Sequence, residues 1–111
     1  MIHTTALIVG AGPSGAACAS KLKQAGVNFL LLDQQPFPRA KPCAGWVTPH
    51  ALRAIGFHPD QYPHSFTTFE EFIISVRGVP FTLPTRQYAI RRVEFDHWLL
   101  ERAGLNVEQH Q

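Results

Sequence analysis

The sequence predicts an α/β fold whose first part is a βαβ unit on a parallel sheet. A short apolar run over residues 5–9 leads into a glycine-rich turn, and an alanine-rich stretch over residues 13–25 follows that turn. A second apolar run over residues 27–32 begins after Gly26 and ends at Asp33. Short apolar runs on either side of a helix are typical of buried parallel strands joined by a crossover helix.

Turn residues divide the rest of the chain into further elements. After a proline-rich loop over residues 34–45, Thr48 suits a helix N-cap, Pro49 the first helical position and Gly56 the helix end. The sequence therefore predicts a short helix over residues 48–55. The remaining predicted elements are antiparallel strands over residues 66–76 and 79–83, a strand over 88–91, a helix over 94–103 and the start of a strand over 105–107.

Composition excludes several classes of protein. The 111 residues are 45% hydrophobic and 16% charged, with a net charge of +2 and no block of lysine or arginine, so we expect no nucleic-acid partner. The scattered histidines and the two cysteines, Cys18 and Cys43, form no metal-ligand or disulfide pattern. We expect no metal, and Cys18 should pack within its helix. No apolar run is long enough to span a bilayer, so we expect a cytoplasmic protein and leave peripheral membrane contact open.

The glycine-rich turn reads Gly10-Ala11-Gly12-Pro13-Ser14-Gly15. With its flanking strand and helix, it matches the Rossmann-like dinucleotide-binding fingerprint. Gly10 permits the tight turn, Gly12 lets a pyrophosphate approach the backbone, and Gly15 lets the helix pack closely on the strand. The N–H groups of the first helical turn, at the positive end of the helix dipole, would then face the phosphates.

Asp33 ends the second strand of this unit and is followed by Gln34. Its carboxylate can accept hydrogen bonds from the adenosine ribose hydroxyls and would repel a 2′-phosphate, which argues against NADP at this site. The spacing does not separate FAD from NAD, because both cofactors use this unit.

The stretch after Asp33 resembles a known group of flavoproteins. Residues 36–47 read Pro-Phe-Pro-Arg-Ala-Lys-Pro-Cys-Ala-Gly-Trp-Val. They are similar to the Phe-Pro-Arg-x-Lys-x-Cys-Gly-Gly-like segment of geranylgeranyl reductases and, more distantly, of p-hydroxybenzoate hydroxylase-like monooxygenases. Ala44 stands where the commoner pattern has its first glycine. Residues 92–96, Arg-Val-Glu-Phe-Asp, match the Arg-x-x-Phe-Asp helix of the same family.

This resemblance implies FAD bound in an extended form, with its AMP half on residues 10–45. It implies that Arg39 and Lys41 lie near the flavin or its phosphates, that Arg92 lies near the pyrophosphate, and that Cys43 lies near the cofactor. Taken alone, Arg39 and Lys41 could also be solvated loop charges, and Cys43 a small packing residue. The expected cofactor-binding residues are Gly10, Ala11, Gly12, Pro13, Ser14, Gly15, Asp33, Gln34, Arg39, Lys41, Cys43, Ala44, Gly45 and Arg92.

The resemblance also implies a function. The full protein would be an FAD-dependent oxidoreductase that passes a hydride to an isoprenoid double bond, with NAD(P)H as one electron donor and an isoprenoid or lipid as substrate. A monooxygenase or flavoprotein dehydrogenase on the same fold is the alternative within the enzymes. A non-catalytic module that binds NAD or another nucleotide is the alternative outside them.

Members of this family are several times longer than 111 residues. They carry a downstream Gly-Asp motif and a substrate lobe built on an antiparallel sheet. We therefore expect an incomplete domain, the N-terminal part of such a protein, with little activity by itself. Residues 1–56 and 88–111 would belong to the FAD-binding part, and residues 57–87 would begin the substrate lobe.

Overall fold

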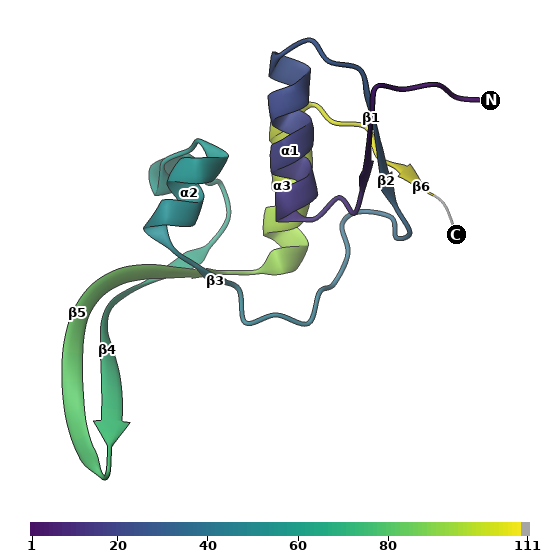
Figure 1. The fold of residues 1–111 in the computed structure, drawn as a ribbon. Helices are drawn as coiled ribbons and strands as arrows, with labels where there is room; N and C mark the ends of the chain where they lie inside the picture. The colour runs from purple at the N-terminus through teal and green to yellow at the C-terminus, as the bar shows by residue number, and fades with distance from the viewer. Residues whose placement is uncertain (110–111) are drawn as a thin grey trace. The chain divides into compact units, whose positions relative to one another are not determined.

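A computed structural model describes residues 1–109 of the chain (Figure 1). The chain divides into two compact units. Unit 1 comprises Met1–Lys41 together with the chain from Arg92 onward, and unit 2 comprises Pro42–Arg91. The elements in chain order are β1 (Ala6–Val9), α1 (Pro13–Gln24), β2 (Phe29–Asp33), β3 (Trp46–Val47), α2 (Pro49–Ile55), the 3-10 turn η1 (Pro59–Gln61), β4 (Phe66–Val76), β5 (Val79–Ile90), α3 (Arg92–Ala103) and β6 (Glu108–Gln109).

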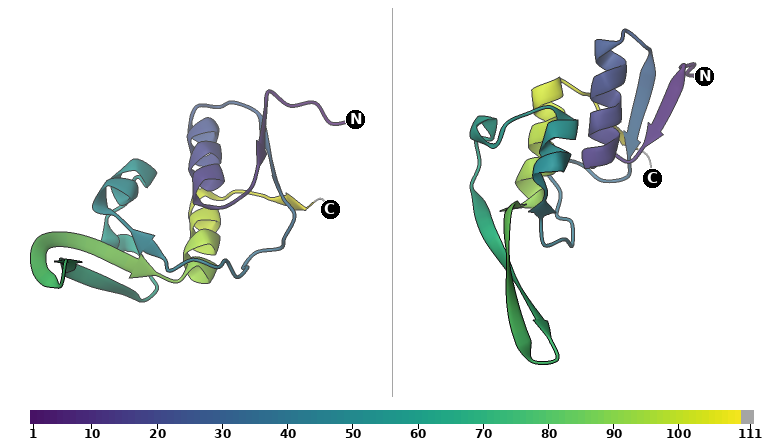
Figure 2. Two further views of the ribbon diagram at one scale, coloured as in Figure 1. Left: turned by 60° about the horizontal axis from the view of Figure 1, so that its bottom comes forward. Right: turned by 60° about the vertical axis from the view of Figure 1, so that its left-hand side comes forward.

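Unit 1 is the predicted βαβ unit, extended by one helix and one short strand. Its parallel sheet has the order β1-β2-β6, with β2 in the centre. Helix α1 packs on β1 and β2 and against α3, and Figure 2 shows the two helices side by side. The predicted parallel sheet and the predicted crossover helix are therefore confirmed. The sequence predicts the C-terminal strand over residues 105–107. It forms instead at β6, because residues 104 and 105 still close the end of α3 with their N–H groups.

The two faces of the sheet in unit 1 differ. Leu31 is buried on the face toward α1, and Ile8 lies beside it in register. Leu7 and Val9, which point the opposite way because side chains alternate along a strand, are 59% and 76% exposed. The sequence predicts β1 as a fully buried strand. In the structure the strand is buried on one side.

Helix α1 buries its small residues and exposes its cysteine. Ala16 and Ala19 are buried in unit 1. The expectation that Cys18 packs within the helix is wrong, since its side chain is exposed. The reason is helical geometry: Cys18 lies about 100° around the axis from Ala19, outside the narrow stripe that faces β1 and β2.

Unit 2 is built on a long antiparallel hairpin. Strands β4 and β5 pair along their length, and β3 pairs with the far end of β5 through Trp46 and Val47. Helix α2 has the predicted caps, since Thr48 Oγ1 accepts the Ala51 N–H at 3.1 Å and Gly56 ends the helix in the left-handed conformation. The core of unit 2 holds four residues that are each less than 9% exposed: Leu52, Phe57, Tyr62 and Tyr88.

One predicted break in this sheet does not occur. The sequence predicts separate strands over residues 79–83 and 88–91, and Pro84 lies between them. The structure joins them in β5, with a register shift between Phe69 and Glu71 on the opposite strand. Such a bulge lets a proline pass through an antiparallel pair without leaving a ladder hydrogen bond unmade.

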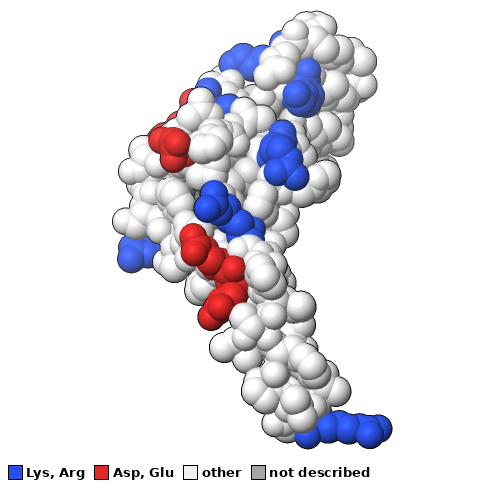
Figure 3. All heavy atoms as spheres, turned by 90° about the vertical axis from the view of Figure 1, so that its left-hand side faces the viewer, with Lys and Arg blue, Asp and Glu red and all other residues white. Residues whose placement is uncertain are grey.

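The distal half of the hairpin has one apolar face. Its cross-strand pairs on that face are Phe72–Leu83, Ile74–Phe81 and Val76–Val79. These side chains share a face because alternate residues along each strand point the same way. Phe81 and Val79 are 53% and 54% exposed. In Figure 3 the arm that this hairpin forms is mostly uncharged surface.

Trp46 lies at the base of the same hairpin. This tryptophan is 63% exposed, and its ring contacts the Phe72 ring edge-on, with 5.3 Å between the centroids. No helix within residues 1–109 is long and apolar enough to cross a membrane.

Candidate functional site

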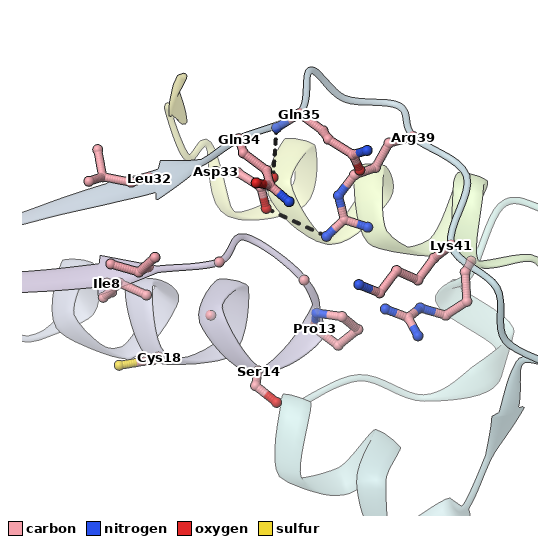
Figure 4. A pocket seen from close by; sticks show the side chains of 15 residues that line it. Ile8, Pro13, Ser14, Cys18, Leu32, Asp33, Gln34, Gln35, Arg39 and Lys41 are labelled. Atoms are coloured by element: carbon pink, nitrogen blue, oxygen red, sulfur yellow. Dashed lines mark hydrogen bonds and ion pairs between the residues drawn. The ribbon is translucent and has the colours of Figure 1, made fainter. Parts of the chain in front are cut away.

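An open pocket of about 870 Å³ lies in unit 1 at the carboxyl ends of β1 and β2, where α1 begins (Figure 4). Crevices at this edge of an open parallel sheet are the usual ligand sites of α/β proteins. The residues that line it are Ile8, Val9, Gly10, Gly12, Pro13, Ser14, Gly15, Cys18, Leu32, Asp33, Gln34, Gln35, Arg39, Lys41 and Arg92. Most of the predicted cofactor-binding residues are thus brought to one place.

The glycine turn has the geometry that its sequence predicts. Gly10 has a φ of +101°, which residues with a side chain rarely adopt. A Cβ on Gly15 would overlap the carbonyl oxygen of Gly10 and reach 3.5 Å from the Ile8 side chain. The helix can therefore lie this close to β1 only with glycine at position 15.

Helix α1 begins at the pocket with no side-chain cap. Gly12 occupies the N-cap position in an extended conformation, and no side chain in the described part of the chain accepts a hydrogen bond there. The N–H groups of the first turn and the positive end of the helix dipole suit an anion at this position.

Asp33 links the end of β2 to the glycine turn. Its Oδ2 accepts the Ala11 N–H at 2.9 Å and its Oδ1 accepts the Gln35 N–H at 2.9 Å. The side chain is 8% exposed. Burial raises the pKa of Asp33, but the Ala11 and Gln35 N–H donors and the nearby Arg39 guanidinium outweigh it, so the pKa lies below its ordinary value. Asp33 is therefore a carboxylate at neutral pH.

Arg39 is not a solvated loop charge. Its side chain is 9% exposed, with Nη2 3.6 Å from Asp33 Oδ2 and Nη1 3.4 Å from Asp96 Oδ2. Its guanidinium also lies over the Phe37 ring, 4.4 Å from the centroid. The loop after β2 thus folds back and places a cation at the pocket, as Figure 4 shows for Arg39 and Asp33.

Arg92, the first residue of α3, brings a second cation to the same pocket. It binds Asp96 in a bidentate pair, with Nε 2.7 Å from Oδ1 and Nη2 2.9 Å from Oδ2. A Cβ on Gly12 would lie 3.5 Å from Arg39 Nη2 and 3.8 Å from Arg92 Nη2. Both guanidinium groups therefore stand beside the backbone of Gly12, where the fingerprint predicts a pyrophosphate.

Sequence reasoning did not count Asp96 among the site residues, although its carboxylate is 1% exposed and contacts both arginines. The signal was present as an Arg-x-x-x-Asp pair four residues apart on one helix face. It also did not name Cys18 and Gln35, which line the pocket. The contact of Arg39 with Asp96 joins residues 57 positions apart, which no local pattern reveals.

Three expected cofactor residues lie in unit 2. The Cys43 side chain is exposed, and its Sγ accepts the Gly45 N–H at 3.3 Å. Ala44 is exposed. Gly45 is buried, and its carbonyl accepts the Ile90 N–H at 2.9 Å. Within residues 1–109 no group of three or more His, Cys, Asp and Glu side chains could hold a metal ion.

Taken together, the pocket offers a helix N-terminus, a carboxylate at a strand end and two guanidinium groups. These features define a dinucleotide-binding unit, in which the cations and the helix dipole face phosphates and the carboxylate faces a ribose. A family model described as NAD(P)-binding Rossmann-like domain matches residues 8–72. The chain belongs to this family.

The sequences of individual relatives indicate the group of reductases to which the chain is similar. Two digeranylgeranylglycerophospholipid reductases of Methanopyrus kandleri are 31% and 33% identical to the chain, each over 92% of it, and the chain covers 27% and 28% of their length. A menaquinone reductase of Mycobacterium tuberculosis is 46% identical over 44% of the chain and 12% of its own length. The predicted membership of the geranylgeranyl reductase group is confirmed. The chain spans about a quarter of the length of the reductases that match most of it.

Solved structures confirm the fold. A flavin-dependent brominase superposes with a TM-score of 0.79 and 23% identity, over 96% of this chain and 29% of the brominase. A geranylgeranyl bacteriochlorophyll reductase-like protein from Thermoplasma acidophilum superposes with a TM-score of 0.76 and 22% identity, over 94% of this chain and 29% of its own.

Proposed function

We propose that the chain is the FAD-binding part of a flavin-dependent oxidoreductase. The observation that carries this proposal is the convergence of the α1 N-terminus, Arg39 and Arg92 on the backbone of Gly12. FAD carries two negatively charged phosphates, and a guanidinium binds phosphate through strong charge-assisted hydrogen bonds. The proposed phosphate contacts are the glycine turn, with Pro13 and Ser14, and the two arginines.

Asp33 is the proposed partner of the adenosine ribose. Each of its oxygens already accepts one N–H, from Ala11 and from Gln35. A carboxylate oxygen has a second lone pair, so Oδ1 can still accept a ribose hydroxyl, whereas Oδ2 also faces Arg39 Nη2 at 3.6 Å. The neighbouring Gln34 lines the same pocket and would contact the adenosine half.

FAD is proposed rather than NAD because of the resemblance of the loop after β2 to a flavoprotein segment; the cations favour a diphosphate, which both cofactors carry. Arg39 and Lys41 reach the pocket from the loop after β2, and Arg92 reaches it from α3. This loop carries the segment that resembles the flavoprotein group. Cys43, Ala44 and Gly45 continue that segment, and their contact with the cofactor belongs to the proposal.

The proposed reaction is reduction of an isoprenoid or lipid substrate, with NAD(P)H as an electron donor. Bound flavin supplies hydride transfer, and the residues of unit 1 bind and orient it. The Methanopyrus relatives are named for a geranylgeranyl phospholipid substrate. The apolar face of the β4–β5 hairpin, with Ile74 and Phe81, is the proposed start of the surface that meets such a substrate.

Other reactions on this fold remain distinct candidates. The similar solved structures include flavin-dependent halogenases. The support for a monooxygenase-like enzyme is this shared fold, which hosts several reactions. A cytoplasmic location is also part of the proposal. The support for it is that Cys18 and Cys43 are not joined in a disulfide within residues 1–109.

Ligand titration of the purified full-length protein tests the proposal. We expect FAD to bind, and FMN, which lacks the adenosine half, to bind far more weakly. A yellow preparation with flavin absorbance is the expected result. Colourless protein that binds NAD and leaves FAD in solution would overturn the proposal and favour the non-catalytic nucleotide module.

A further inference from the structure

Asp96 is the most deeply buried charged side chain of unit 1. It lies on α3 and is 1% exposed, and its oxygens accept Arg92 Nε at 2.7 Å, Arg92 Nη2 at 2.9 Å and Arg39 Nη1 at 3.4 Å. Moving a carboxylate out of water is costly, and an ion pair often does not repay that cost in stability. The burial of Asp96 therefore calls for a reason beyond folding.

The reason lies in where its two partners stand. Arginine side chains have many rotamers, and fixing one side chain in place costs conformational entropy. Asp96 holds both guanidinium groups beside Gly12 before any ligand arrives. A ligand that meets fixed cations does not have to order them, so its affinity rises.

The sign of the change in phosphate binding distinguishes a positioning role of Asp96 from a simple electrostatic effect. Asp33, Arg39, Asp96 and Arg92 form one chain of alternating charges, two negative and two positive. In a purely Coulombic view, removing the negative charge of Asp96 would strengthen the attraction for phosphate. If the carboxylate instead fixes the arginines, removing it weakens phosphate binding. The two effects have opposite signs.

We infer that Asp96 is a positioning residue that holds Arg39 and Arg92 at the glycine turn for the phosphates of the dinucleotide. This inference rests on the proposed FAD site. Asp96 need not touch the ligand, because it acts through the two arginines.

The first test compares FAD affinity in the full-length protein and its Asp96→Asn variant. The substitution removes the charge and keeps the size of the side chain. We expect a loss of affinity of roughly tenfold or more, the usual effect of losing a charge-assisted contact. The matched control is Glu101→Gln on the same helix, where an exposed carboxylate pairs with His97 four residues away at 2.7 Å. It should leave FAD affinity unchanged.

A double-mutant comparison separates positioning from a structural effect. If Asp96 acts through the two arginines, adding Asp96→Asn to an Arg39→Gln/Arg92→Gln background should change FAD affinity by no more than about threefold, because both partners of Asp96 are already absent there. An equal loss in both backgrounds would show that Asp96 only supports the fold and would overturn the inference. Unchanged or tighter FAD binding by Asp96→Asn would overturn it as well.

A measurement on the ligand-free parent protein covers the case in which Asp96→Asn does not fold. Asp96 should slow solvent exchange of the Arg92 Nε proton by about tenfold or more relative to that of Arg77, which lies in the β4–β5 turn. Equal exchange at both arginines would overturn the inference. Absence of FAD binding to the parent would overturn the proposed function instead, and the exchange measurement would still report on Asp96.

Discussion

Replacing Asp33 by alanine should destabilise unit 1 even without a ligand. In the structure this carboxylate is 8% exposed and fastens the glycine turn to the end of β2 through the Ala11 N–H, 22 residues away. Asp33→Ala removes that acceptor and a second bond to the Gln35 N–H. Arg39 keeps Asp96 as a partner, so the substitution does not leave it unpaired.

The size of the effect follows from which N–H groups water can reach. Ala11 is completely buried, so its N–H would be left without an acceptor, at a cost of about 1–3 kcal/mol. Gln35 is exposed and water can replace the carboxylate there, which limits that loss to roughly 0.5 kcal/mol. We expect Asp33→Ala to lower the free energy of unfolding by about 1.5–3.5 kcal/mol, the sum of the two losses.

Chemical denaturation at neutral pH and in acid measures this contribution. Because the pKa of Asp33 is lowered on folding, its contribution is complete above the ordinary pKa of 3.8 and is lost as the pH falls through the folded pKa. The difference between parent and variant should therefore shrink in acid. The control is Asp60→Ala, which removes a carboxylate that is 87% exposed and should change stability by no more than about 0.5 kcal/mol. Equal effects of the two substitutions at neutral pH would refute the role of Asp33.

Three further substitutions test other parts of unit 1. Gly12→Val should leave the melting temperature nearly unchanged, since a Cβ meets only ordinary van der Waals contacts at this position. It should abolish FAD binding, because the branched side chain fills the space beside the guanidinium groups. Equal flavin content in mutant and parent would contradict this. Gly15→Ala should lower the free energy of unfolding by about 1–3 kcal/mol, because its Cβ overlaps the Gly10 carbonyl oxygen, and an unchanged melting curve would count against the packing described for α1. Lys23→Met should lower the free energy of unfolding by about 1 kcal/mol, because Lys23 Nζ donates to the carbonyl of Ala103, the last residue of α3, at 3.0 Å and to that of Gly104 at 2.8 Å. An unchanged thermal denaturation curve would show that these contacts do not stabilise the helix end.

Local chemistry explains why the sequence alone determined so much of unit 1 and of its pocket. The strand–glycine turn–helix–strand order is a local pattern, and Gly10, Gly15 and Asp33 perform backbone tasks that few other residues can. The short helix of unit 2 was equally predictable, because Thr48 and Gly56 satisfy its ends with their own atoms. The loop after Asp33 resembles a segment of the geranylgeranyl reductase group, and the relatives confirm that group.

Only the tertiary structure decided which distant groups meet. The continuity of β5 past Pro84 involves a bulge, in which two β5 residues lie opposite one residue of β4. The burial of each face of β1 depends on what packs on it. The network at the pocket joins Arg39 and Asp96, which are 57 residues apart. A one-dimensional pattern records spacing along the chain, whereas the position of a charge at a ligand site depends on side chains that folding brings together.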